Sequence, residues 1–242
     1  MKTFSPGKIF LNEQRGCSEN AAMRIQSTFN FGGFHSAHKQ PFGRLRVLNE
    51  NVLAPGSSLT LTADKPGFLL ILPVVGRIEY EAGYGSYKVE AGQVLLIGME
   101  AGKKLDIRNP LEKDLVNFLE IRIAGEASGL HSSAVIDFDI DAGRNRLVDL
   151  QPHFAGRQFP FYAGICKLDG RQELEYQTRE AGNELFTFVI QGAFEVQNRL
   201  LHQGDGLALW EPGKVEMEAL SNDAIILVLD LLPPVAMCSF AG

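Results

Sequence analysis

The stretch Phe68-Leu-Leu-Ile-Leu-Pro-Val-Val-Gly76-Arg-Ile-Glu79 is an apolar run, then a glycine, then the start of a run in which apolar and polar residues alternate. Far along the chain, Leu185-Phe-Thr-Phe-Val-Ile-Gln-Gly192-Ala-Phe-Glu195 repeats this pattern. Each copy continues through a glycine turn, Ala91-Gly92 in the first and Gly204-Asp205-Gly206 in the second, into another apolar run. Similarity over this length predicts two copies of one β-unit and therefore a duplicated fold.

Alternation with a period of two dominates the rest of the chain, as in Leu59-Thr-Leu-Thr62 and Lys214-Val-Glu-Met-Glu218. Turn signals recur every ~8–12 residues, a spacing typical of all-β sandwiches and barrels. We therefore predict an all-β protein with two antiparallel β-barrels, one within residues 1–125 and one within 126–242. An N-terminal arm is expected to cross onto the other half, and residues 134–140 are expected to form an edge strand.

Composition excludes several classes of protein. The net charge is −6 and the longest run of basic residues is Lys103-Lys104, which disfavours direct nucleic-acid binding. No apolar stretch approaches the ~20 residues of a membrane helix, and the N-terminus carries no signal-peptide pattern. Three scattered cysteines form neither a disulfide framework nor a metal motif. These features predict a cytoplasmic protein with no membrane association.

Three motifs carry a resemblance to a known family: Thr28-Phe-Asn-Phe-Gly32, Pro41-Phe-Gly-Arg-Leu-Arg-Val-Leu-Asn-Glu-Asn51 and Val89-Glu-Ala-Gly92. Together with the duplicated β-unit, they resemble the pirin family of two-domain cupins (bicupins), which is related to bacterial pirin-like quercetin dioxygenases. The resemblance runs from about residue 24 to the C-terminus. It implies that both barrels are of the cupin type, the double-stranded β-helix.

The resemblance also implies where a metal would bind in the N-terminal barrel. Cupins carry two histidines, one residue apart, at a fixed distance after a glycine, and counting from Gly56 places these positions at Thr62 and Asp64. The other two ligand positions of pirins, a histidine and a glutamate, fall on Leu105 and Ile107. We therefore expect these four residues to line the barrel as former metal-ligand positions. Because aliphatic side chains cannot ligate iron, nickel or copper, we expect no metal and no other cofactor.

A second group of residues marks a candidate pocket or rim at the mouth of this barrel. His35-Ser-Ala-His38 has metal-like spacing, but no third or fourth ligand follows nearby, so a surface loop and a rim site both remain open. Arg46 and Asp64 could contact a ligand there.

These observations are compatible with two functions from different classes. The first is a non-enzymatic protein that binds a small organic ligand in the N-terminal barrel or a protein partner, with no catalytic residues. The alternative is an oxidoreductase like the quercetin dioxygenases, with iron, nickel or copper at a displaced site built from Asp64 with His35 or His38. The N-terminal arm is a candidate for self-association, and the sequence does not decide the oligomeric state.

Overall fold

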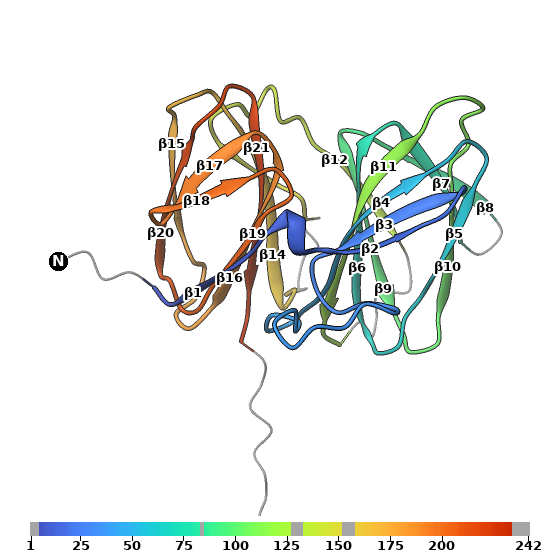
Figure 1. Ribbon diagram of the computed structural model, residues 1–242, viewed down its shortest axis with the longest axis horizontal. Helices are drawn as coiled ribbons and strands as arrows, with labels where there is room; N and C mark the ends of the chain where they lie inside the picture. Colours follow the sequence, from blue (N-terminus) through green and yellow to red (C-terminus); the bar gives the residue numbers. More distant parts are fainter. Residues whose placement is uncertain (1–4, 83–84, 127–132, 152–157, 234–242) are drawn as a thin grey trace, which may run out of the picture.

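A computed structural model describes residues 5–82, 85–126, 133–151 and 158–233. The predicted all-β fold is confirmed: two barrels stand side by side, and each pairs a large sheet with a four-stranded sheet (Figure 1). All strand pairs are antiparallel. The one helical element of the described residues is a short 3-10 helix, η1 (Asn12–Gln14).

The first barrel has a seven-stranded and a four-stranded sheet. The seven-stranded sheet has the order β12 (Ala134–Asp137), β9 (Gln93–Met99), β6 (Gly67–Val75), β11 (Val116–Ala124), β4 (Leu45–Leu53), β3 (Met23–Ser27) and β2 (Gly16–Glu19). The four-stranded sheet has the order β5 (Ser58–Thr62), β10 (Lys104–Arg108), β7 (Arg77–Ala82) and β8 (Gly85–Glu90).

The second barrel repeats this plan with six and four strands. Its larger sheet has the order β1 (Gly7–Phe10), β19 (Gly206–Leu209), β16 (Glu184–Gln191), β21 (Ala224–Leu231), β14 (Phe161–Leu168) and β13 (Leu147–Asp149). Its smaller sheet has the order β15 (Glu173–Gln177), β20 (Lys214–Ala219), β17 (Ala193–Val196) and β18 (Arg199–His202).

The two barrels exchange strands at their edges. The N-terminal strand β1 pairs with β19 of the second barrel, with Lys8 opposite Ala208, which confirms the predicted crossing of the N-terminal arm. Strand β12 pairs with β9 at the edge of the first barrel, so the predicted edge strand is confirmed for Ala134–Asp137, whereas residues 138–140, predicted to continue it, lie outside the strand. Each half of the chain, when divided after residue 125, therefore lends one strand to the barrel of the other half.

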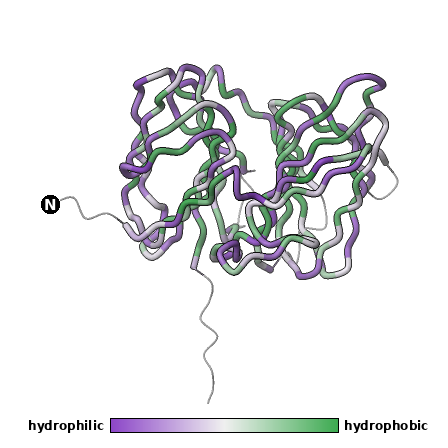
Figure 2. The backbone as a smooth tube through the Cα atoms, in the orientation of Figure 1, coloured by the Kyte–Doolittle hydropathy of each residue, from purple (hydrophilic) through white to green (hydrophobic). Residues whose placement is uncertain are grey.

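The two large sheets pack face to face, which explains why a central strand such as β6 is apolar throughout. On β6, Leu69 and Ile71 face the interior of the first barrel, whereas Leu70 and Leu72 belong to the cluster between the barrels. The apolar residues accordingly concentrate along these central strands (Figure 2). A strand covered on both faces reads as a continuous apolar run, because neither set of alternate residues meets water.

A buried arginine, Arg15, contacts residues of both barrels at their junction. The Arg15 side chain has no exposed surface and pairs with Glu50 at 3.1 Å, while its Nη2 donates to the Gln26 carbonyl at 2.7 Å. Its guanidinium lies 5.4 Å from the centre of the Phe188 ring, which belongs to the second barrel. Burial lowers the pKa of Arg15, and Glu50 opposes that shift.

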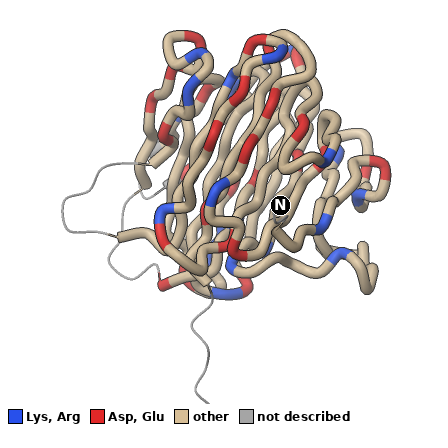
Figure 3. Tube along the Cα trace, turned by 90° about the vertical axis from the view of Figure 1, so that its left-hand side faces the viewer, with Lys and Arg blue, Asp and Glu red and all other residues tan. Residues whose placement is uncertain are grey.

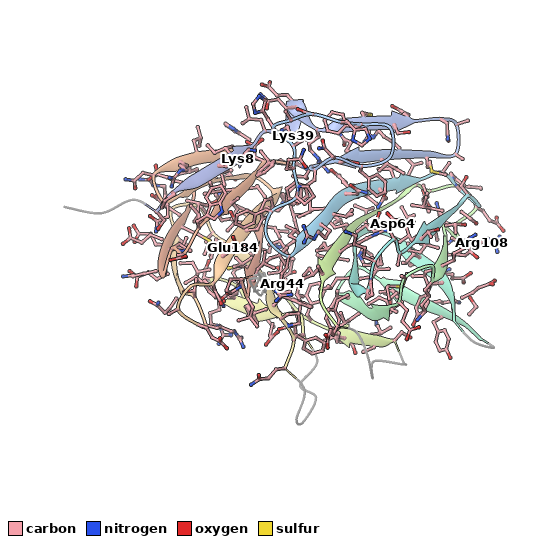
Figure 4. All side chains as sticks on the ribbon, turned by 90° about the horizontal axis from the view of Figure 1, so that it is seen from below. Lys8, Lys39, Arg44, Asp64, Arg108 and Glu184 are labelled. Atoms are coloured by element: carbon pink, nitrogen blue, oxygen red, sulfur yellow. The ribbon has the colours of Figure 1, made fainter. Side chains whose placement is uncertain are left out.

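A half-buried carboxyl group at the junction, that of Glu184, predicts a pH-dependent effect on stability. Burial raises the pKa of Glu184 and the charge of Glu211 raises it further, whereas Arg44 lowers it (Figure 4). Oε2 of Glu184 is buried without a hydrogen-bond partner among the described residues. A raised pKa in the folded state means that stability is lost as the pH rises from the unfolded to the folded pKa. Glu184→Gln should therefore raise the Tm at pH 7.5 and raise it less at pH 4.

Thermal denaturation at the two pH values measures this effect, and Glu180→Gln, at an exposed position, is the matched control. An equal gain for Glu184→Gln at both pH values would contradict the assignment.

Candidate functional site

The inward positions of strands β5 and β10 carry aliphatic side chains. Leu61 pairs with Leu105, and the next inward pair on these strands is Leu59 with Ile107. Leu61, Leu105 and Ile107 are buried in the apolar interior of the first barrel, and Ala63, just beyond the end of β5, is buried with them.

The structure corrects two of the predicted interior positions. Leu105 and Ile107 lie inside the barrel, but Thr62 and Asp64 are exposed and face outward (Asp64 is labelled in Figure 4). The prediction that Thr62 and Asp64 line the interior is therefore wrong by one residue. Because side chains alternate along a strand, a count that slips by one moves every residue to the opposite face.

The residues inside the first barrel do not fit a family-type metal ion. The four inward positions are now Leu61, Ala63, Leu105 and Ile107, and none of these side chains has a lone pair to donate. Within the described ranges, no three His, Cys, Asp or Glu side chains gather closely enough to hold a metal ion. We therefore derive no chemistry through a metal at these positions.

A polar cluster lies inside the same barrel, on the neighbouring strands β4 and β11. Glu120 is completely buried, and its Oε1 accepts a hydrogen bond from Nε of Arg122 at 2.6 Å. Its Oε2 accepts hydrogen bonds from Nδ2 of Asn49 and Nδ2 of Asn51, each at 3.3 Å. Strand register sets this geometry, because Glu120 stands opposite Asn49 and Asn51 is the next inward residue on β4.

Arg122 connects this cluster to the strand that carries the inward aliphatic residues. Its Nη1 donates a hydrogen bond to the Thr62 carbonyl at 2.5 Å. Its guanidinium lies 5.8 Å from the centre of the Phe31 ring. The chain thus places a permanent cation of its own beside Ala63, held by a carboxylate and a carbonyl oxygen. Oδ1 of Asn51 is buried and accepts no hydrogen bond from any described residue.

This cluster is not apparent from the hydrophobic pattern of the sequence. Leu119-Glu-Ile-Arg-Ile123 alternates, and alternation normally predicts that the charged residues face water. Here Leu119, Ile121 and Ile123 pack between the barrels, so Glu120 and Arg122 face the barrel interior. One feature of the sequence did indicate that these charges are buried. They lie in the last strand of the repeat, and the corresponding strand of the second copy, Ala224-Ile-Ile-Leu-Val-Leu229, is entirely apolar.

The three predicted rim residues are exposed. The side chains of His35, His38 and Arg46 lie at the surface, and the imidazoles of the two histidines make no hydrogen bond to any described residue. The backbone carbonyl of His38 accepts a hydrogen bond from Lys8 Nζ at 2.6 Å. A ligand-binding role for these three side chains stays a prediction.

The second barrel holds a different buried carboxylate, Asp230. Its Oδ2 accepts hydrogen bonds from the Tyr176 hydroxyl and the Arg179 backbone amide, both at 2.8 Å. Its Oδ1 accepts one from Nδ2 of Asn183 at 2.6 Å. Burial, with the hydrogen bond to Asp230, raises the pKa of Tyr176, so this tyrosine is a neutral donor at physiological pH. Three donors satisfy the carboxylate, which gives Asp230 a structural role.

The outer sheet of the second barrel presents an acidic face. A groove of about 310 Å³ runs along it, and Figure 3 shows the acidic residues along these strands. The groove is lined by Glu173, Glu175, Glu195, Glu216 and Glu218, together with the neutral residues Leu174, Gln197, Asn198 and Met217. Arg171 pairs with Glu218 at 2.9 Å and Lys214 with Glu175 at 2.7 Å, so two of these charges are neutralised locally.

Comparisons with known proteins agree with the architecture. Residues 160–231 match the quercetinase C-terminal cupin domain. The chain is 22% identical over 228 residues to a quercetin 2,3-dioxygenase of Escherichia coli K12, covering 92% of this chain and 96% of that protein.

Two solved structures share the fold. The crystal structure of YhhW from E. coli superposes with a TM-score of 0.80 at 19% identity, covering 95% of this chain and 99% of that one. The bacterial pirin YhhW in complex with nickel(II) gives 0.77 at 19% identity, covering 95% and 100%. The resemblance predicted from the sequence is therefore confirmed.

In the part of the chain that the structure describes, no helix has the length and apolar character needed to span a membrane.

Proposed function

We propose that this pirin-like two-barrel cupin is a non-enzymatic binding or regulatory protein of the cytoplasm whose first barrel works without a metal ion. The observation that carries the proposal is the set of aliphatic side chains at the four inward positions, Leu61, Ala63, Leu105 and Ile107. A metal needs donor atoms at such positions, and its affinity depends on the groups that orient those donors.

The buried cluster next to these positions supports the proposal. Arg122 supplies a fixed positive charge, and Glu120 with the Thr62 carbonyl neutralises and orients it. An additional cation nearby would be repelled by the guanidinium. The unpartnered Oδ1 of Asn51 is an acceptor that suits an N–H or O–H donor, such as a small neutral organic ligand carries.

Elemental analysis of the protein tests this proposal. We expect protein purified without a chelator to contain iron, nickel, copper, zinc and manganese at far less than one atom per chain, because the inward positions offer no ligand set. Removal of trace metal with a chelator should leave the Tm unchanged. A stoichiometric transition metal, lost together with thermal stability on chelation, would contradict the proposal.

A second candidate function rests on the relative named quercetin 2,3-dioxygenase and on the quercetinase C-terminal domain match. On this alternative, the chain is an oxidoreductase with iron, nickel or copper bound at a displaced site that includes Asp64 with His35 or His38. Anaerobic reconstitution with each metal, followed by quercetin and oxygen, separates the two functions. Turnover above a metal-only blank that is abolished by Asp64→Ala would favour the enzyme.

A further inference from the structure

Two lysines from different halves of the molecule meet on one aromatic ring. Lys8 lies on β1, which belongs to the second barrel, and its Nζ is 4.9 Å from the centre of the Phe10 ring. Lys39 lies in the segment between β3 and β4 of the first barrel, and its Nζ is 5.5 Å from the same centre. Both lysines are labelled in Figure 4.

No acidic side chain in the described part of the chain forms an ion pair with either lysine. Lys39 is only 5% exposed, and neither ammonium group has an ion-pair partner among the residues that the structure describes. Lys8 Nζ donates a hydrogen bond to the His38 carbonyl at 2.6 Å, which leaves it charged and available for further donation. Burial lowers the pKa of Lys39, and the charges of Lys8 and Arg15 lower it further.

The two carboxylates of this region are already engaged. Asp205, whose charge opposes the pKa shift of Lys39, accepts hydrogen bonds from the Asn12 backbone amide at 2.7 Å and the His202 backbone amide at 2.8 Å. Glu50 pairs with Arg15 at 3.1 Å. In a protein of net charge −6, the three cations Lys8, Lys39 and Arg15 therefore face two carboxylates, each of which is already held by other groups.

We propose that Lys8 and Lys39 form a binding site for a small oxyanion, the phosphate or carboxylate group of a small molecule. Two ammonium groups held beside one ring without an ion-pair partner among the described residues repel each other, and an anion that accepts hydrogen bonds from both lysines offsets that repulsion. The Phe10 ring, which lies 4.9 Å from one ammonium group and 5.5 Å from the other, takes the place of water beside each of them and so strengthens their interaction with an anion. This site is separate from the interior of the first barrel, and the inference does not depend on the proposed function.

Anion binding at this position would join the two barrels. One lysine comes from the N-terminal arm and the other from the first barrel, so an anion between them ties the arm in place. Because the unfolded chain lacks the site, the anion should raise the Tm in a concentration-dependent way.

Calorimetric titration and thermal denaturation with sodium phosphate and, separately, sodium succinate test the proposal, with sodium chloride at matched ionic strength as the reference. We expect saturable binding of at least one of the two anions, and the one that binds identifies phosphate or carboxylate as the preferred group. Lys39→Met should weaken its binding at least about tenfold and abolish the rise in Tm. Lys113→Met, at an exposed position, should behave like the parent protein.

Lys8→Met provides an independent test, because this side chain is less buried and its replacement leaves Lys39 in place. It too should weaken anion binding about tenfold. If Lys39→Met fails to fold, Lys8→Met decides the question. Absence of saturable binding of both anions to the parent protein, or unchanged affinity in a folded lysine variant, would overturn the proposal.

Discussion

Replacement of Glu120 by leucine is expected to lower the free energy of unfolding by about 3–5 kcal/mol, because it removes one partner of a buried ion pair. The change leaves the guanidinium of Arg122 with the Thr62 carbonyl as its one remaining acceptor among the described residues. It also leaves Nδ2 of Asn49 and Nδ2 of Asn51 without the carboxylate oxygen that they share. Urea denaturation, with the slope compared between variants, measures the loss.

The double variant Glu120→Leu with Arg122→Leu separates the loss of the pair from the loss of one partner. Replacing both members of a buried pair by apolar residues is often neutral or stabilising, so the double variant should recover most of the stability lost by Glu120→Leu. Glu120→Gln, which keeps the shape and removes the charge, should fall between the parent and Glu120→Leu. Equal destabilisation by the single and double variants would show that Glu120 matters only for its packing.

The architecture could be predicted from the sequence because it depends on repetition and hydrophobic pattern. The two copies around Gly76 and Gly192 predicted two barrels, and both glycines adopt the positive φ, 79° in each, that a tight turn between strands requires. The exchanged strand β12 was visible as an isolated alternating run. Its pairing with β9 is a long-range contact, which the sequence does not specify.

The site was harder to predict because it depends on register. Counting from Gly56 assumes that the strand begins at the same distance after the glycine as in other cupins. The alternation of Leu59, Leu61 and Ala63 with polar neighbours already indicated the other register, which the structure adopts. Hydrophobic alternation shows which residues of this strand face the interior. A fixed count from a glycine instead assumes that the strand has the same register as in other cupins.

The buried cluster around Glu120 shows a second reason why the site could not be predicted from the hydrophobic pattern. Alternation places charged residues on the solvent-exposed face of a strand only when one face of that strand is exposed to solvent. Strand β11 has the second barrel on one side and the interior of its own barrel on the other, so neither face is open to bulk water along its length. In that setting Glu120 and Arg122 pair with each other. The fold tolerates them because the neighbouring asparagines also donate to Glu120 and the Thr62 carbonyl also accepts from Arg122.

The corrected register predicts where a metal site could be rebuilt. A variant with Leu61→His, Ala63→His, Leu105→His and Ile107→Glu places four donors on the inward faces of two paired strands, and we expect it to bind nickel or cobalt at least about 100-fold more tightly than the parent protein. The matched control, Thr62→His and Asp64→His combined with the same changes at 105 and 107, has two of its four donors pointing outward and should bind at least about tenfold more weakly than the inward variant.

Titration with cobalt, followed by its visible absorption, compares the two variants after circular dichroism has established that both are folded. Removal of the guanidinium with Arg122→Met should strengthen binding in the inward variant, because a fixed cation next to the site repels the metal. Equal affinity of the inward and outward variants would mean that residues 61 and 63 do not share an interior with residues 105 and 107. The aliphatic side chains at these positions would then not be evidence that the barrel works without a metal ion.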